Sequence, residues 1–308
     1  MKDRLRKLNF VQKALTRKTF NTNLNKGVMA VEIRNTIGIG ARLAWVLEIL
    51  AFCDEKQLQP QFKFTYPDSK TDYFAQFFSI HDDYACADAS VKFVKIFTIS
   101  ELDLGKNYDT ELTVEFASYL IKKYLVIRED VLQEVEGFWQ KHFFDNESFF
   151  NNKKTFEKSI LGVHFRGTDK STEAPVVTYE YVEENIKIFL KKYPQTSGVF
   201  VSSDDHHFIT YIKDRTIGVP VVSRNDSYRA TNNEAIHLSR QNKYDINRDA
   251  IVNCLLLARC HALIKSASIL SAWSVLFNPE ILLVMLNAPF EQYFPERALL
   301  ERVVYDPV

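Results

Sequence analysis

The sequence predicts an α/β protein built from two Rossmann-like domains. A strand, a glycine turn and a helix follow one another near the amino terminus, and apolar strands alternate regularly with amphipathic helices from residue 159 onward. Alternation at this spacing is typical of parallel sheets covered by helices on both faces. The uneven polar stretch 145–158 is a candidate linker, so we expect domains at 1–150 and 151–308 with a cleft between them.

The amino-terminal half opens as a Rossmann-like unit does. A strand is expected at 29–33 and a helix from about 41 to 57, and Gly38 and Gly40 form the turn between them. Such a turn lets a backbone approach a nucleotide, so both glycines are candidate nucleotide-sugar contacts. The remaining elements predicted for this half are strands at 61–65 and 91–98 and helices at 113–125 and 130–143.

The carboxyl-terminal half carries the more regular pattern. Its expected strands are 159–164, 198–202, 219–222, 262–265 and 281–286. Its expected helices are 179–193, 206–214, 249–259 and 268–277. Catalytic and binding groups are expected where strands end, because open α/β sheets hold ligands at the carboxyl ends of their strands.

Composition excludes several classes of protein. The 39 basic and 39 acidic residues balance, which argues against nucleic acid as a partner. No apolar run is long enough to span a membrane, and the first twenty residues lack the apolar core of a secretory signal. The four cysteines show no C-x-x-C spacing and are expected to be reduced, so we expect a cytoplasmic protein.

Residues 1–20 form a basic segment with apolar positions at near-helical spacing. A helix of this kind can lie on an anionic membrane surface. It can equally be a solvated first helix that docks on its own domain. The apolar stripe serves either interpretation, so peripheral membrane contact stays open.

The segment His164–Ala174 follows an expected strand and concentrates the charged groups. The guanidinium of Arg166 suits a phosphate or pyrophosphate, and Glu173 could act as a general base. Lys170 could add a second positive charge or pair with Glu173. The competing interpretation is a charged loop in which Asp169 caps a turn and Arg166 binds neighbouring carbonyls.

Two further strand ends carry polar residues. Asp204 and Asp205, followed by His206 and His207, invite a metal interpretation, but consecutive residues of a strand point to opposite faces. We therefore expect Asp205 to be a helix N-cap and one acid to face the ligand, with no metal.

The third strand end is followed by a serine-rich turn. In it, Ser266 and Ser268 could form an anion site at a helix start, and Ser268 could also be a plain N-cap. His237 and Arg229, in the polar stretch before the third site, could reach the same cleft.

Taken in order, these three segments resemble the motifs of the α1,6-fucosyltransferase superfamily. The family's first motif has the form H-x-R-x-T-D-K followed by T-E-A, and its second is a strand that runs into T-D-D. The matching residues are His164-Phe165-Arg166-Gly167-Thr168-Asp169-Lys170, Thr172-Glu173-Ala174, Val199 to Asp205, and Ala250 to Ser271. The resemblance covers roughly 160–275, and its first motif is the most specific.

The resemblance implies a GT-B fold, in which two Rossmann-like domains face a cleft, and an inverting reaction without a metal. Arg166 would bind the donor β-phosphate, and His164 would lie near the nucleotide base. Glu173 would be the catalytic base, coupled to Lys170. Asp205 and Ser268 would help to hold the nucleotide. The other candidate nucleotide-sugar contacts are Gly38, Gly40, Asp169, His237, Asp249, Asn253 and Ser266.

Three positions depart from the family pattern. Gly167 stands where animal members have a second arginine, and the spacing from Lys170 to Glu173 is one residue shorter. Asn253 stands where the family has an aspartate that reads guanine. Asp249, one helical turn earlier, could substitute, or the donor could carry another base such as uracil or thymine.

We therefore expect a glycosyltransferase that transfers fucose from GDP-fucose to a glycan or lipid-linked saccharide, without cofactor or metal. Two alternatives stay open: transfer of another sugar, such as rhamnose, from a UDP or dTDP donor, and a non-catalytic nucleotide-sugar-binding protein. A phosphotransferase would require the phosphate-binding loop G-x-x-x-x-G-K-[ST], which the sequence lacks.

Overall fold

The structure is a computed structural model and comprises two compact units. Unit 1 holds residues up to Leu112 together with Tyr119–Arg128, and unit 2 holds Thr113–Ser118 together with residues from Glu129 onward. The residues described are 16–302, with the exception of Ala89, 145–158, 168–171, Thr216, Tyr228 and 230–241.

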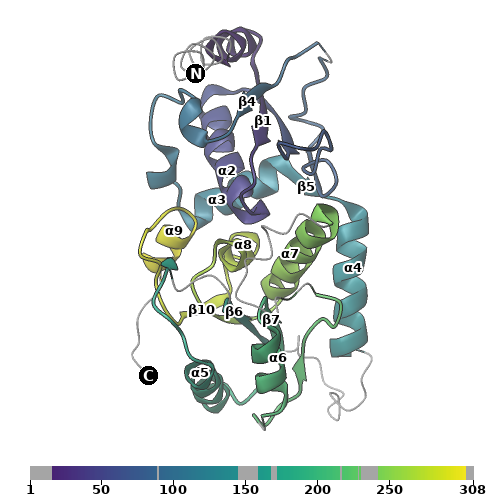
Figure 1. Cartoon of the computed structure of the whole chain (residues 1–308), viewed down its shortest axis with the longest axis vertical. Helices are drawn as coiled ribbons and strands as arrows, with labels where there is room; N and C mark the ends of the chain where they lie inside the picture. The colour runs from purple at the N-terminus through teal and green to yellow at the C-terminus, as the bar shows by residue number, and fades with distance from the viewer. Residues whose placement is uncertain are drawn as a thin grey trace. The chain divides into compact units, whose positions relative to one another are not determined.

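The division between the units lies near residue 128 instead of 150, because helix α4 (Glu129–Trp139) belongs to unit 2. Figure 1 shows α4 beside α7 (Lys243–Ala258), and ion pairs join the two helices. Arg248 of α7 donates to Glu134 and to Asp130, each at 2.8 Å. The linker predicted at 145–158 lies outside the described residues.

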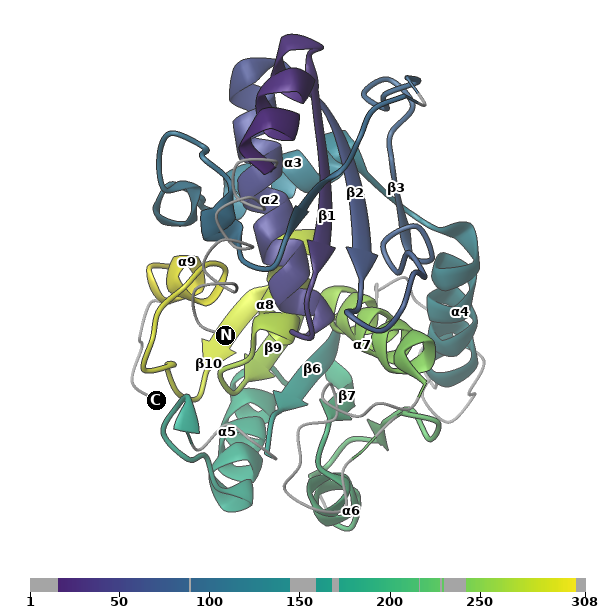
Figure 2. The ribbon, with the colours of Figure 1, turned by 45° about the horizontal axis from the view of Figure 1, so that its top comes forward.

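Unit 1 is built on a three-stranded parallel sheet, in the order β2-β1-β4. The central strand β1 (Val28–Arg34) pairs with β2 (Gln59–Thr65) and β4 (Val94–Ile96). It is apolar almost throughout, as a strand covered on both faces must be. Figure 2 shows β1 and β2 side by side, with α2 (Ile39–Lys56) beside them.

Most predicted elements of this half are present, with shifted ends. The strand expected at 91–98 is limited to β4, because Thr98 and Glu101 form a capping box that starts the 3₁₀ turn Ile99–Glu101. Helix α3 (Val114–Tyr124) matches the prediction. The second predicted helix is α4 continued by the π-helical turn Gln140–Phe144.

A two-stranded antiparallel sheet of unit 1 was not predicted. It pairs β3 (Phe78–Ile80) with β5 (Leu125–Ile127), with Ser79 opposite Val126. Strand β5 follows α3 directly, without glycine, proline or another turn residue to mark the change. Three-residue strands are too short to show an alternating pattern. Unit 1 also contains a second 3₁₀ turn, Tyr108–Thr110.

The described end of the basic amino-terminal segment docks on unit 1. Residues 16–25 are helical. Phe20 is buried and stacks on Phe52 of α2 with ring centroids 6.3 Å apart. The side-chain amide of Asn23 donates to the carbonyl of Lys92 at 2.9 Å. The apolar positions before residue 16, which serve the membrane interpretation, lie outside the described residues.

Unit 2 is built on a five-stranded parallel sheet, in the order β10-β9-β6-β7-β8. From the central strand β6 the chain adds β7 and β8 on one side, then crosses back and adds β9 and β10 on the other side. This is the strand order of a Rossmann sheet. The α/β class with two Rossmann-like units is thus confirmed, and the cleft stays a prediction. The strands are β6 (Ser159–Phe165), β7 (Thr196–Ser203), β8 (Val221–Val222), β9 (Ala262–Lys265) and β10 (Leu282–Met285).

Among the described residues, unit 2 contains the start of α3 and the helices α4, α5 (Tyr179–Lys192), α6 (His206–Lys213), α7, α8 (Ile269–Phe277) and α9 (Glu296–Leu300). Helix α7 begins six residues before the predicted start, because Asn242 accepts a hydrogen bond from the Asp245 amide at 3.3 Å and caps it. Helix α9 was not predicted. Its Glu296 forms a buried ion pair with Lys265, the last residue of β9, at 3.2 Å.

Within the described ranges, no helix has both the length and the apolar character needed to cross a membrane.

Glu48 is a buried carboxyl group on α2, with 8% of its surface exposed. Burial raises its pKa from an ordinary 4.5 to about 7, and the nearby carboxylate of Asp109 adds to the increase. With the native pKa raised, the folded protein retains a proton that the unfolded chain releases. Stability therefore falls as pH rises from 4.5 to 7 and stays lower above pH 7.

We predict that Glu48→Gln removes this loss, because glutamine keeps the shape of the protonated acid and does not ionise. At pH 8 the variant should exceed the wild type in free energy of unfolding by about 1–3 kcal/mol, and the difference should vanish near pH 4.5. Urea unfolding of both proteins at the two pH values measures it. Parallel pH profiles would contradict the prediction.

Candidate active site

The candidate site lies at the carboxyl edge of the unit 2 sheet, where β6 ends between β7 and β9. In the register of the sheet, His164 of β6 stands opposite Ser202 of β7 and Lys265 of β9. All five strands are parallel, but the chain adds β7 and β8 on one side of β6 and β9 and β10 on the other. The loops after β6 and β9 therefore leave in opposite directions, and in α/β sheets ligands bind at such a point. The three predicted motifs therefore meet at one edge (Figure 2).

The turn after β9 binds the end of β6 through Ser266. The Ser266 hydroxyl accepts a hydrogen bond from the Arg166 amide at 2.8 Å, and the Ser266 amide donates to the carbonyl of His164 at 3.0 Å. Ser266 is buried, so its role visible here is to fix the backbone of Arg166. Ser268 is buried at the N-cap position of α8, and its side chain makes no capping hydrogen bond.

The loop after β7 binds the same segment from the other side through Asp204. One carboxylate oxygen of Asp204 accepts from the Gly167 amide at 3.1 Å, and the other lies 3.5 Å from Nε of Arg166. The Arg166 side chain stays about one-fifth exposed, at 20%. Its charge is thus partly accessible at the sheet edge, as binding of a phosphate requires.

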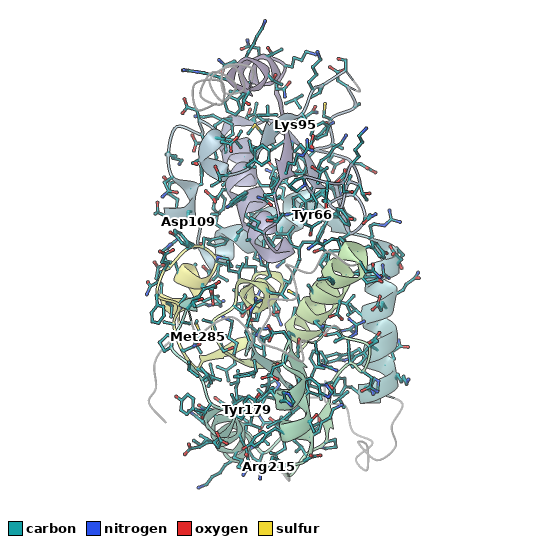
Figure 3. The ribbon with its side chains drawn as sticks, viewed as in Figure 1. Tyr66, Lys95, Asp109, Tyr179, Arg215 and Met285 are labelled. Carbon is teal, nitrogen blue, oxygen red and sulfur yellow. The ribbon has the colours of Figure 1, made fainter. Side chains whose placement is uncertain are left out.

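Asp205 is the N-cap of α6, as predicted. One carboxylate oxygen accepts from the amides of His207 at 2.8 Å and Phe208 at 3.3 Å. The other accepts from the hydroxyl of Tyr179, the first residue of α5, which is labelled in Figure 3. Burial and this hydrogen bond raise the pKa of Tyr179 well above its ordinary range. Both oxygens of Asp205 thus have protein donors, which leaves little capacity for a ligand.

Asp204 and Asp205 accordingly bind different protein groups. In the described part of the chain, no three His, Cys, Asp or Glu side chains gather in a way that could hold a metal ion.

Gly167 fills a space that admits no side chain. A Cβ atom at this position would lie 2.6 Å from the Phe165 ring and 2.8 Å from an Asp205 carboxylate oxygen. Neither group can move easily, because the ring packs against Tyr179 and Phe208 and the carboxylate has three donors. The structure therefore explains why a second arginine cannot follow Arg166 here.

Glu173 lies in an exposed position, and its backbone is held in place. Its carbonyl accepts from the Phe290 amide at 2.8 Å, and the next residue, Ala174, is buried. The side-chain amide of Asn287 donates to the Pro175 carbonyl at 2.6 Å. Sequence reasoning missed Asn287, since a single asparagine after a strand carries no motif. Asp169 and Lys170 lie outside the described residues.

The residues expected to read the nucleotide base bind other parts of the protein. The Asn253 side-chain amide donates to the Ser227 hydroxyl at 3.2 Å, and Asp249 accepts from Arg224 at 2.9 Å. Arg229 donates to the carbonyl of Arg224. Asn253 and Asp249 of α7, together with Arg229, thus all bind the segment 224–227 that follows β8. His237 lies outside the described residues.

Gly38 and Gly40 lie in unit 1, at the start of α2. Gly38 is the N-cap and Gly40 is within the first turn, so the helix begins before the predicted residue 41. Neither glycine has a positive φ. Arg42 holds this turn: it is buried, donates to Asn35 at 3.1 Å, and lies 4.2 Å from the ring centroid of Tyr66, which Figure 3 labels.

No family model matches the chain, and no curated protein matches it in sequence. Solved structures similar to it include the alpha-1,6-fucosyltransferase NodZ soaked with GDP-fucose, at 13% identity and a TM-score of 0.46 over 82% of this chain and 93% of that one. NodZ from Bradyrhizobium is 14% identical, with a TM-score of 0.47 over 82% and 94%. A variant of Arabidopsis thaliana FUT1 in complex with GDP is 9% identical, with a TM-score of 0.44 over 87% and 72%. The strand order and register of the two parallel sheets define the fold independently of these likenesses.

We predict opposite effects of alanine at two glycines of unit 2. Gly167→Ala should lower the free energy of unfolding by about 1–3 kcal/mol, because Phe165 or Asp205 must move. Gly137→Ala is the matched control. Nothing lies within 4 Å of its added Cβ, and alanine favours the surrounding helix α4, so stability should rise by about 0.5–1 kcal/mol. Urea unfolding measures both; effects of the same sign would contradict the crowding at Gly167.

Proposed function

We propose that the chain is an inverting, metal-independent glycosyltransferase that uses a nucleotide-sugar donor. One observation carries the proposal: the turn after β9 holds both the backbone of Arg166 and, through Asn287, the segment that carries Glu173. Ser266 of this turn binds the Arg166 amide, and Ala267 binds Asn287, which also holds the segment of Glu173. The resemblance of His164–Ala174 to the first fucosyltransferase motif supports the same roles.

In the proposed reaction the acceptor hydroxyl oxygen attacks the anomeric carbon of the sugar from the face opposite the diphosphate. The new carbon–oxygen bond forms as the bond to the phosphate oxygen breaks, which inverts the anomeric configuration. Glu173 takes the hydroxyl proton as general base. Arg166 binds the departing nucleoside diphosphate, where negative charge increases in the transition state, and so lowers the barrier. Lys170 is the proposed partner of Glu173.

The proposed donor is GDP-fucose, and the acceptor is a glycan or lipid-linked saccharide. The motif resemblance supports fucose. Asn253 donates to Ser227 and Asp249 accepts from Arg224, so these contacts do not select guanine over another base. A UDP or dTDP donor, and with it rhamnosyl transfer, is therefore the alternative. Binding of the nucleotide sugar without turnover is the second alternative.

The proposal is tested with GDP-fucose, UDP-glucose and dTDP-rhamnose. One of them should raise the melting temperature and release its nucleoside diphosphate, with water or an oligosaccharide as acceptor. Arg166→Ala should lower that release about 100- to 1000-fold. Arg215→Ala, which removes a half-exposed arginine of the same unit, should have no effect.

Release by Arg166→Ala within twofold of the wild type would refute the mechanism. A thermal shift without any release, unchanged by Glu173→Gln, would favour the non-catalytic alternative.

We also propose that the enzyme is cytoplasmic and that residues 1–15 contact an anionic membrane that carries the lipid-linked acceptor. The support is the excess of basic residues in this segment. Deletion of residues 1–15, which keeps the docked Phe20, should abolish binding to phosphatidylglycerol vesicles and leave the melting temperature unchanged. Vesicle binding equal to that of the full chain would exclude this role.

A further inference from the structure

Asn287 joins the two loops of unit 2 that carry the proposed chemistry. Its side-chain oxygen accepts from the Ala267 amide at 2.6 Å, and its side-chain nitrogen donates to the Pro175 carbonyl at 2.6 Å. Ala267 is fully buried in the turn after β9. One short side chain therefore links this turn directly to the segment of Glu173.

The position of Asn287 is set by the sheet. The amide of Leu286 donates to the carbonyl of Lys265 at 2.8 Å, which extends the pairing of β10 with β9 up to the last residue before Asn287. The asparagine therefore stands beside the turn of Ser266 and Ala267 in a fixed register. Ser266 in turn binds the amide of Arg166.

The Glu173 segment, residues 172–175, is held on both sides of Ala174. The Glu173 carbonyl accepts from the Phe290 amide, the Pro175 carbonyl accepts from Asn287, and Ala174 between them is 1% exposed. Both flanking carbonyls thus bind the segment 287–290. The backbone from which the Glu173 side chain extends is fixed relative to Arg166.

We propose that Asn287 is a positioning residue for Glu173; this role rests on the proposed function. A general base must lie within hydrogen-bond reach of the proton that it takes, and a displacement of about 1 Å can lower the rate about 100-fold. Asparagine fits the position because it offers one acceptor and one donor in one plane. Aspartate keeps the acceptor for Ala267 and loses the donor for Pro175.

The test compares Asn287→Ala and Asn287→Asp with Asn278→Ala. The control removes a similar hydrogen bond, from the Asn278 side chain to the Ala258 carbonyl at 2.8 Å, in the same unit. Both Asn287 variants should speed amide hydrogen exchange in the Glu173 segment. They should also lower kcat for release of the nucleoside diphosphate about 10- to 100-fold, while KM for the sugar nucleotide stays within about twofold of the wild-type value. The control should change neither quantity.

A double variant separates positioning from general destabilisation. If Asn287 acts through Glu173, adding Asn287→Ala to Glu173→Gln should lower kcat no further. An unchanged kcat in Asn287→Ala, with Glu173→Gln impaired, overturns the role of Asn287 and leaves the proposed function intact. Full activity of Glu173→Gln instead refutes the proposed base, and the positioning role falls with it.

Discussion

The parallel alignment of β6 between β7 and β9 is the constraint on which the site depends. It brings the loops of three distant sequence segments to one sheet edge, so that Ser266 and Asp204 can bind the backbone on either side of Arg166. The alignment needs close packing. A Cβ at Gly162 of β6 would lie 3.1 Å from the sulfur of Cys260 and 3.2 Å from the side chain of Leu257 in α7, so even alanine would require both neighbours to shift.

The apolar elements of unit 2 could be predicted because their sequence pattern coincides with their burial. Strands β6, β7 and β9 each contain a short apolar run, at 160–163, 198–201 and 262–264. Helix α5 has its stripe of Val182, Ile186 and Phe189 buried, as periodicity requires. The caps were partly predictable. Asp205 is of a residue type that caps helices, lies just before α6, and accepts hydrogen bonds from its first amides. Ser268 is also of such a type and lies just before α8, but its side chain makes no capping hydrogen bond.

The features that sequence reasoning missed depend on distant partners. Nothing local marks Asn287, because its function arises only when β10 lies beside β9. The start of α7 was missed because Asn242 caps it from a left-handed conformation at φ 43°, inside a polar stretch that resembles a loop. The place of α4 in unit 2 also depends on distant partners, since Arg248 of α7 binds its Glu134 and Asp130.

The ion pairs of α4 also determine what happens when the chain is cut. A fragment beginning at residue 151 would contain Arg224, Arg248 and Arg259 without their α4 partners. The carboxylates that such a cut removes are Asp130, Glu134 and Glu136. Arg224 would keep its ion pairs with Asp226 and Asp249, whereas Arg248 and Arg259 would lose the carboxylates that pair with them in the whole chain. A fragment that begins at Glu129 retains α4 and with it all three carboxylates, so it keeps these arginines of unit 2 paired.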